Sequence, residues 1–278
     1  MQSSDLAFYS LVACALCGVL WLAGQPLWLR WRRRRLRNSV FPEEWRRILR
    51  RRVPLVARLP SDLQLRLKQD MLVLLAEKPM LGCAGLRVTD AMRVTVAALA
   101  CIPLLGARRG YYPELQRILL YPAAFAAPHV HVDEDGVQSD GLRALSGESW
   151  SQGQVLLSWQ EVLDSAADPT DGRNVVIHEF AHQLDQSKGY ANGAPPLRTR
   201  QAYRGWSSVM QAEYVALQRR LRVGQHGLID EYAATDPAEF FAVCSELFFE
   251  RGADLAAEHP ALYAELRAYY RVDPLSWS

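Results

Sequence analysis

The sequence predicts an α+β fold that is rich in helix, contains a small sheet and is preceded by one apolar helix. Two short apolar runs bounded by proline or glycine, at residues 117–125 and 154–159, are typical of strands. Most other apolar residues recur with helical spacing. Both strand candidates lie ahead of a helix expected at residues 172–186. With 278 residues, 50% of them hydrophobic, the chain can bury a sizeable core.

A segment without charge near the amino terminus predicts a membrane anchor. No charged residue occurs from Leu6 to Leu29, and about 20 apolar residues suffice to cross a bilayer core as a helix. The arginine-rich flank that follows favours single-pass insertion in the inner membrane with the rest of the chain in the cytoplasm. A buried core helix and a cleaved signal peptide are the alternatives. The expected domains are a transmembrane anchor at 6–29, a basic juxtamembrane linker at 30–40 and a main domain at 41–278.

Seven helices are expected in the main domain. Pro42 suits the first turn of the first helix and Pro54 ends it, while Ser61 and Asp90 are expected as the N-caps of the next two. The later helices are expected over residues 172–186, from about 199 to 223, from Asp236 onward, and over 259–271.

The strand candidates leave two questions open. The run "QVLLSW" at 154–159 is either an internal core strand or an edge strand that pairs with an extended peptide. His129 and His131 share one face of an extended stretch, where a polar, exposed strand end is favoured over a metal site.

The stretch "NVVIHEFAHQLD" at 174–185 predicts a metal-binding helix. On a helix, residues four apart lie on one face, so His178 and His182 can direct their imidazoles at one ion. Glu179 has the position of the general base in H-E-x-x-H metalloproteases, in which Zn²⁺ activates a water molecule. The alternative is an ordinary amphipathic helix, whose buried side the flanking apolar residues would supply.

A catalytic zinc site needs a third protein ligand. The extended H-x-x-G-x-x-H pattern is absent, because Asp185 and Lys188 occupy the positions that require glycine and histidine. Asp185 is instead expected to accept a hydrogen bond from a ligand imidazole. A carboxylate from further along the chain must then complete the site. The candidates are Glu213, Glu231, Glu239 and Glu246.

The stretch "DEYAATDPAEFFAVCSELFF" draws attention to one of these glutamates. Asp236 is expected to cap a very apolar helix with Pro237 at its first position, which places Glu239 in the first turn. Spacing alone favours neither of two roles for Glu239, a metal ligand or a capping-box glutamate that folds back on the backbone.

Several stretches together resemble the Mlc titration factor A (MtfA) family of zinc peptidases, distantly similar in their site to anthrax lethal factor. They are "RILLYPAAF", "GESWSQGQVLLSW", "VVIHEFAHQLD", "EYAATDPAEFFAVCSELFF" and "DPLSW", and the resemblance covers about residues 41–278. It implies a zincin-like peptidase domain with zinc held by His178, His182 and Glu239. It also implies Glu179 as the base and Tyr232 as a hydroxyl that stabilises the oxyanion.

The resemblance also sets expectations about partners. Family members are described as binding the glucose repressor Mlc, so we expect a peptide or protein substrate and a transcriptional repressor as a second partner. Direct nucleic-acid binding is not expected, because the arginine run is interpreted as a membrane-flanking segment. The alternative function is a non-catalytic protein that sequesters a regulator and uses zinc to stabilise its fold. Glu179 favours catalysis, since a structural site needs no general base.

Overall fold

The computed structural model describes most of the chain, which divides into two compact units, Met1–Val40 and Phe41–Ser278. The described residues are 2–106, 110–123, 125–132, 138–145, 147–150, 153–186, 189 and 191–277. The backbone of His129 and His131 belongs to a strand, and the prediction about their side chains lies outside what is described.

The first unit consists of one long helix, α1 (Gln2–Arg37), which corrects the expected membrane anchor. In the described part of the chain, none of the helices combines the length and the apolarity that a transmembrane span requires. The predicted single-pass localisation in the inner membrane is therefore wrong, and neither the anchor at 6–29 nor the membrane as a partner is supported. The predicted linker at 30–40 is also helical up to Arg37.

The charge-free segment is one part of a longer helix that also contains the arginine-rich stretch. Pro26 lies inside this helix, where it removes a backbone hydrogen bond. The helix also does not end with the apolar run. The guanidinium of Arg32 lies 5.8 Å from the ring centre of Trp28, so tryptophans and arginines pair along one continuous helix.

In the second unit, the described residues form a four-stranded sheet in the order β1-β2-β6-β5 and a separate antiparallel pair, β3-β4. The strands are β1 (Met80–Gly82), β2 (Arg117–Tyr121), β3 (Phe125–Val132), β4 (Gln138–Leu145), β5 (Gly147–Trp150) and β6 (Gln154–Ser158). Strands β1, β2 and β6 are parallel, and β5 runs antiparallel at the edge. The run at 154–159 thus provides an internal strand rather than an edge strand.

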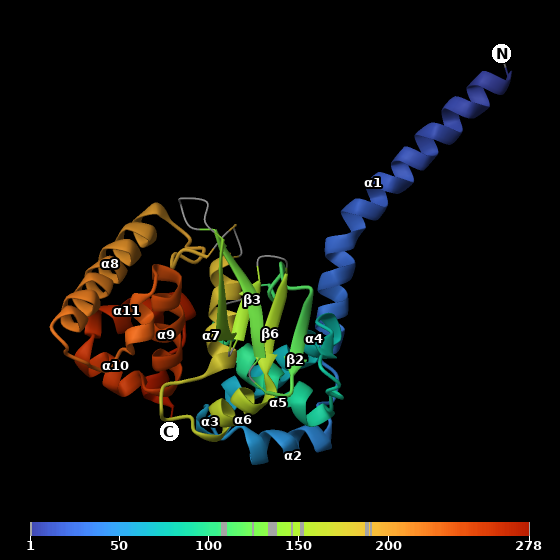
Figure 1. The fold of residues 1–278 in the computed structure, drawn as a ribbon. Coiled ribbons are helices and arrows are strands. Elements are labelled where there is room, and N and C mark those ends of the chain that lie inside the picture. Colours follow the sequence, from blue (N-terminus) through green and yellow to red (C-terminus); the bar gives the residue numbers. More distant parts are fainter. Residues whose placement is uncertain are drawn as a thin grey trace. The chain divides into compact units, whose positions relative to one another are not determined.

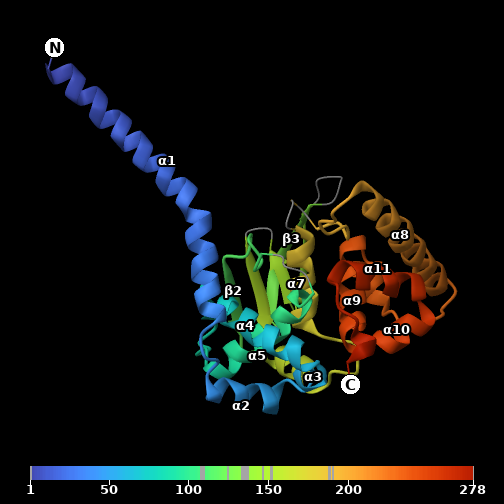
Figure 2. The ribbon, with the colours of Figure 1, turned by 180° about the vertical axis from the view of Figure 1, so that it is seen from behind.

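Helices make up most of the other described residues of the second unit (Figure 1). Their bounds are α2 (Glu43–Arg52), α3 (Leu55–Arg58), α4 (Ser61–Glu77), α5 (Asp90–Cys101), α6 (Trp159–Ala167), α7 (Val175–Asp185), α8 (Arg200–Arg222), α9 (Pro237–Glu250), α10 (Gly252–Glu258) and α11 (Pro260–Tyr270), with short 3₁₀ helices η1 (Ile102–Leu104), η3 (Glu231–Ala234) and η4 (Pro274–Ser276). Figure 2 shows α4 and α5 in front of the sheet. The expected helix-rich α+β architecture is confirmed.

Two predicted caps are displaced by one residue. Ser61 and Asp90 are the first helical residues of α4 and α5, not their N-caps. At α5 the preceding Thr89 is the cap, and its hydroxyl accepts a hydrogen bond from the Met92 amide. Asp90 remains favourable in the first turn because a carboxylate there interacts with the positive end of the helix dipole.

Helix α9 is the most buried helix of the C-terminal part. Every residue from Phe240 to Glu250 is buried, and α8, α10 and α11 surround this helix. Aromatic rings fill the contacts: Phe248 stacks on Tyr270 at 5.5 Å, and Trp206 meets Phe241 edge to face at 5.6 Å. Truncating such a buried ring costs about 3–5 kcal/mol, so α9 is held firmly in place.

Candidate metal centre

Helix α7 carries the two histidines and is fixed at its start by Asn174. The side chain of Asn174 accepts a hydrogen bond from the Ile177 amide at 3.1 Å and so caps the helix. The apolar side of α7 is buried through Val176, Ile177, Phe180, Ala181 and Leu184. The opposite side holds His178 and His182 one turn apart, with ring centres separated by 4.9 Å.

Helix α9 brings the third side chain. Asp236 caps this helix by accepting hydrogen bonds from the amides of Ala238 and Glu239, and Pro237 occupies the first helical position. The carboxylate of Glu239 does not fold back on the cap. One oxygen lies 2.9 Å from Nε2 of His178, and the other lies 3.5 Å from Nε2 of His182.

The three side chains form a donor set whose spacing suits a metal ion. One ligand atom from each of His178, His182 and Glu239 lies within 4.8 Å of the others, and the two Nε2 atoms are 3.2 Å apart. Ligands held tetrahedrally at about 2.1 Å from one ion stand about 3.4 Å from each other, close to the observed separations. Two imidazoles and one carboxylate are also the ligands of many catalytic zinc sites. The residues therefore fit a zinc ion.

The other candidate ligands are engaged elsewhere. Glu213 contacts Nδ1 of His259 at 2.8 Å, and the exposed Glu231 lies 3.8 Å from Nδ1 of His226. Glu246 faces the far nitrogen of His178, with 2.7 Å between Oε1 and Nδ1. Of the four glutamates considered from the sequence, only Glu239 faces both histidines of α7.

Carboxylates dominate the electrostatics of the donor set. Burial lowers the pKa of His178, but the carboxylates of Glu246 and Glu239 outweigh burial and hold this pKa well above its usual value. For Glu239, burial raises the pKa, and the bonds from the two imidazoles reverse the effect and hold it well below its usual range. A carboxylate that stays ionised beside two imidazoles is suited to bind a cation.

Asp185 has a different role from the expected one. Its Oδ2 accepts hydrogen bonds from the amides of Asn192 at 2.7 Å and Gly193 at 2.6 Å. Gly193 has a positive φ of 74°, and a Cβ there would meet the Pro237 carbonyl oxygen at 2.3 Å. Asp185 therefore holds a loop from the end of α7 tightly against the start of α9. The carboxylate that faces a donor-set histidine on the side away from Glu239 is that of Glu246 instead.

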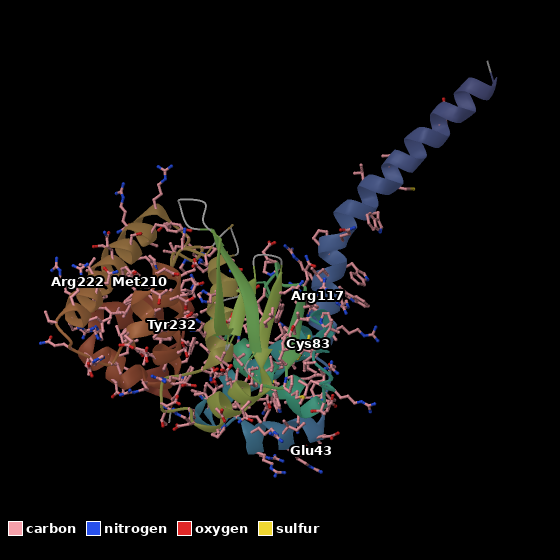
Figure 3. All side chains as sticks on the ribbon, viewed as in Figure 1. Glu43, Cys83, Arg117, Met210, Arg222 and Tyr232 are labelled. Carbon is pink, nitrogen blue, oxygen red and sulfur yellow. The ribbon has the colours of Figure 1, made fainter. Side chains whose placement is uncertain are left out.

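A cleft of about 460 Å³ adjoins the donor set. His178 and Glu179 line it, together with Tyr232 from η3. Glu179 is only 3% exposed, whereas Tyr232 is 46% exposed. The ring centre of Tyr232 lies 6.1 Å from that of His178. Figure 3 labels Tyr232 among the side chains of the second unit. The cleft thus brings a buried carboxylate and an accessible hydroxyl-bearing ring to the same histidine.

Carboxylates predominate among the remaining charged groups of the cleft. They belong to Glu161, Asp164, Asp171, Asp230 and Glu246. Arg173 also lines the cleft, and its guanidinium is 2.6 Å from Asp230. The same aspartate accepts a hydrogen bond from the Tyr232 amide at 2.9 Å, so this ion pair lies beside the tyrosine.

The fold and the site define a metallopeptidase-like protein: a helix-rich α+β domain in which two histidines of one helix and a glutamate of another converge beside a cleft. The model of the glucose-regulated metallo-peptidase M90 family matches residues 28–271. The chain belongs to this family.

Individual relatives agree with this assignment over most of their length. The chain is 37% identical over 268 residues to the uncharacterized protein slr2042 of Synechocystis, covering 96% of this chain and 98% of that protein. It is 35% identical over 226 residues to Mlc titration factor A of Klebsiella pneumoniae, covering 81% and 84%. Against Mlc titration factor A of Yersinia enterocolitica the identity is 32% over 260 residues, covering 92% and 91%. The resemblance to the Mlc titration factor A family is thereby confirmed.

Proposed function

We propose that this protein is a zinc-dependent peptidase in which His178, His182 and Glu239 hold the metal. The observation that carries the proposal is the convergence of these three side chains beside a cleft that Glu179 also lines. Membership of a metallo-peptidase family supports the same function. A zinc ion bound there would polarise the scissile carbonyl and lower the pKa of a water molecule.

Glu179 is the general base of the proposed reaction. Its carboxylate accepts a proton from the attacking water and returns that proton to the leaving amine when the peptide bond breaks. Its placement supports this role: Glu179 is buried on α7 next to His178, yet its side chain borders the cleft in which a peptide would lie.

Tyr232 stabilises the transition state of the proposed reaction. As the carbonyl is attacked, its oxygen gains negative charge, and a hydroxyl placed to donate a hydrogen bond to that oxygen lowers the barrier. The exposed ring of Tyr232 beside His178 supports this role.

A second function, binding of a transcriptional repressor, is favoured by the relatives. Several of them bear the name Mlc titration factor A, which links those proteins to Mlc. We propose that a repressor of this kind is a partner of the present protein as well. Sequestration without catalysis is the alternative to peptidase activity, and in that case the zinc site would only stabilise the fold.

The test compares zinc content and peptide hydrolysis in the full-length wild type and in Glu179→Gln. Gln keeps the shape of Glu but cannot accept the proton, so the variant is expected to retain zinc and lose hydrolysis by at least about 100-fold. Glu231→Gln is the matched control, because Glu231 is exposed and makes no contact with the donor set.

Each result of this test distinguishes the two functions. Hydrolysis by the wild type and by Glu231→Gln, together with its loss in zinc-loaded Glu179→Gln, supports the peptidase. Zinc in all three proteins without cleavage of any peptide in a broad panel contradicts it and favours sequestration. A wild type that binds no zinc contradicts both functions as proposed.

A further inference from the structure

Glu246 of α9 makes two contacts with α7, one with the imidazole of His178 and one with the start of the helix. Its Oε1 lies 2.7 Å from Nδ1 of His178, and its Oε2 accepts a hydrogen bond from the Asn174 backbone amide at 2.5 Å. The residue is only 7% exposed. Both carboxylate oxygens of Glu246 therefore have partners, one on the histidine and one at the N-cap of the helix that carries this histidine.

Helix α9 places this glutamate two turns after Glu239. Residues seven apart lie on the same face of a helix, so Glu239 and Glu246 both face α7. They reach the same imidazole from opposite sides: Glu239 lies 2.9 Å from Nε2 of His178, and Glu246 contacts Nδ1. The ring is therefore held between two carboxylates that belong to one rigid, buried helix.

We propose that Glu246 is a positioning residue for the metal site: its carboxylate accepts a hydrogen bond from the Nδ1–H group of His178 and thereby directs the lone pair of Nε2 at the metal. This inference rests on the proposed zinc site, but not on the proposed peptidase activity. A neutral imidazole carries its proton on only one nitrogen, so fixing it at Nδ1 leaves Nε2 free as a ligand. Outer carboxylates of this kind orient the ring and increase its basicity.

The two contacts of Glu246 explain why a glutamine at this position cannot replace the carboxylate as acceptor of both hydrogen bonds. Glu246 meets two donors, the Asn174 amide and the Nδ1–H group of His178, and a glutamine has only one oxygen. If that oxygen faces Asn174, the NH₂ group faces the imidazole and favours the tautomer with the proton on Nε2. A protonated Nε2 has no lone pair to offer to a metal. If the oxygen faces the imidazole, two buried donors meet at Asn174.

The closest matched control is Glu250, one turn further along α9. It is 3% exposed, and its Oε1 accepts a hydrogen bond from the Asn174 side chain at 2.8 Å. Glu250 therefore shares the helix, the burial and the Asn174 partner of Glu246, while its hydrogen bond comes from Asn174 and not from a histidine. Glu250→Gln changes a buried carboxylate to an amide next to the same cap.

The experiment measures Zn²⁺ affinity of the full-length wild type, Glu246→Gln and Glu250→Gln by competition with a chromophoric chelator. We expect Glu246→Gln to bind Zn²⁺ about 10–100-fold more weakly, the usual effect of losing an outer ligand partner. Glu250→Gln is expected to stay within about threefold of the wild type. Circular dichroism of each protein shows whether the fold is intact.

A second readout follows the tautomer directly. In ¹⁵N–¹H correlation spectra of the zinc-bound wild type, His178 is expected to carry its proton on Nδ1, and this signal should persist in Glu250→Gln. In Glu246→Gln the Nδ1 proton signal should be lost or shifted. The wild-type spectrum tests the proposal even if Glu246→Gln does not fold.

The outcomes separate this proposal from the proposed function. Folded Glu246→Gln with wild-type zinc affinity, or a zinc-bound wild type without a proton on Nδ1 of His178, overturns the positioning role alone. An equal loss of Zn²⁺ affinity in Glu246→Gln and Glu250→Gln also overturns the positioning role, because such a loss would follow from removing any buried carboxylate of α9. A wild type that binds no Zn²⁺ overturns the zinc site and the positioning role together.

Discussion

The donor set and the outer wall of the cleft are built in opposite ways. The donor set, His178, His182 and Glu239, lies on two well-packed helices, and buried side chains such as Glu246 hold it from behind. The outer wall comprises Asp171, Arg173, Asp230 and Tyr232, which come from a connecting segment and a short 3₁₀ helix. Side-chain exposure there reaches 77% at Arg173.

This difference teaches how the site divides its tasks. Metal binding requires that the ligand atoms be held in place to within a few tenths of an ångström, and buried helices can maintain that precision. Recognition of a substrate tolerates adjustment and is commonly carried by loops on a rigid scaffold. Changes in the donor set should therefore affect metal affinity, whereas changes in the outer wall should affect catalysis and selectivity without loss of the metal.

The largest effect is expected for Glu239→Gln. The change removes the only anionic member of the donor set, and Zn²⁺ affinity should fall by more than about 100-fold, because loss of an outer partner alone costs about 10–100-fold. Chelator competition measures the affinity, with Glu231→Gln as the control. Near-wild-type affinity in Glu239→Gln would mean that the third ligand is another residue.

On the outer wall, Tyr232→Phe should reduce kcat by about 100-fold, the usual effect of removing one donor to an oxyanion. Zinc content and KM should change little, because the hydroxyl acts only when charge develops on the substrate. Steady-state kinetics and metal analysis on the same preparation measure both. Loss of zinc in Tyr232→Phe would erase the distinction between the two regions.

Glu250→Gln should change how stability depends on pH. Burial raises the pKa of Glu250 from 4.5 to about 8, with help from neighbouring carboxylates and despite the bond from Asn174. Between these values the folded protein keeps a proton that the unfolded chain releases, so this group lowers stability as the pH rises from about 4.5 to 8. Glutamine cannot ionise and removes this loss.

We compare the free energy of unfolding of Glu250→Gln with that of the wild type at pH 5 and at pH 8. The difference, variant minus wild type, is expected to be larger at pH 8 by at least about 1.4 kcal/mol, the equivalent of one pKa unit. Urea unfolding at both pH values measures this difference. The exposed Glu231→Gln should follow the wild type at both. A pH-independent difference would show that Glu250 is ionised in the folded protein.

The smallest effect is expected from the charge of the substrate. Carboxylates of Glu161, Asp164 and Asp171 line the cleft, and the guanidinium of Arg173 is paired with Asp230. A peptide with lysine or arginine should therefore have a kcat/KM about threefold to tenfold above that of a matched glutamate peptide at low salt, with the ratio falling as salt is added. Asp164→Asn combined with Asp171→Asn should reduce the ratio, and an unchanged ratio would contradict the electrostatic explanation.

Local sequence patterns predicted much of the helical structure around the site. Asp236 and Pro237 marked the start of α9 because caps and first-turn prolines act within a few residues. The charge-free segment at 6–29 misled, because it is one part of a helix that continues through the arginines to Arg37. Glu246 was considered only as a metal ligand. Its position in a helix that is apolar on all sides was the available signal, since a buried carboxylate needs a partner.

The sequence by itself determined the class of the protein, the helix that carries the two histidines and the spacing of His178 and His182, because residues four apart share a helix face whatever surrounds them. Only the tertiary structure decided which of four glutamates faces these histidines and which one holds His178 from behind. Glu239 and Glu246 lie 61 and 68 positions beyond His178 in the chain. The packing of α9 against α7 brings them there, and no local pattern specifies contacts at such separations.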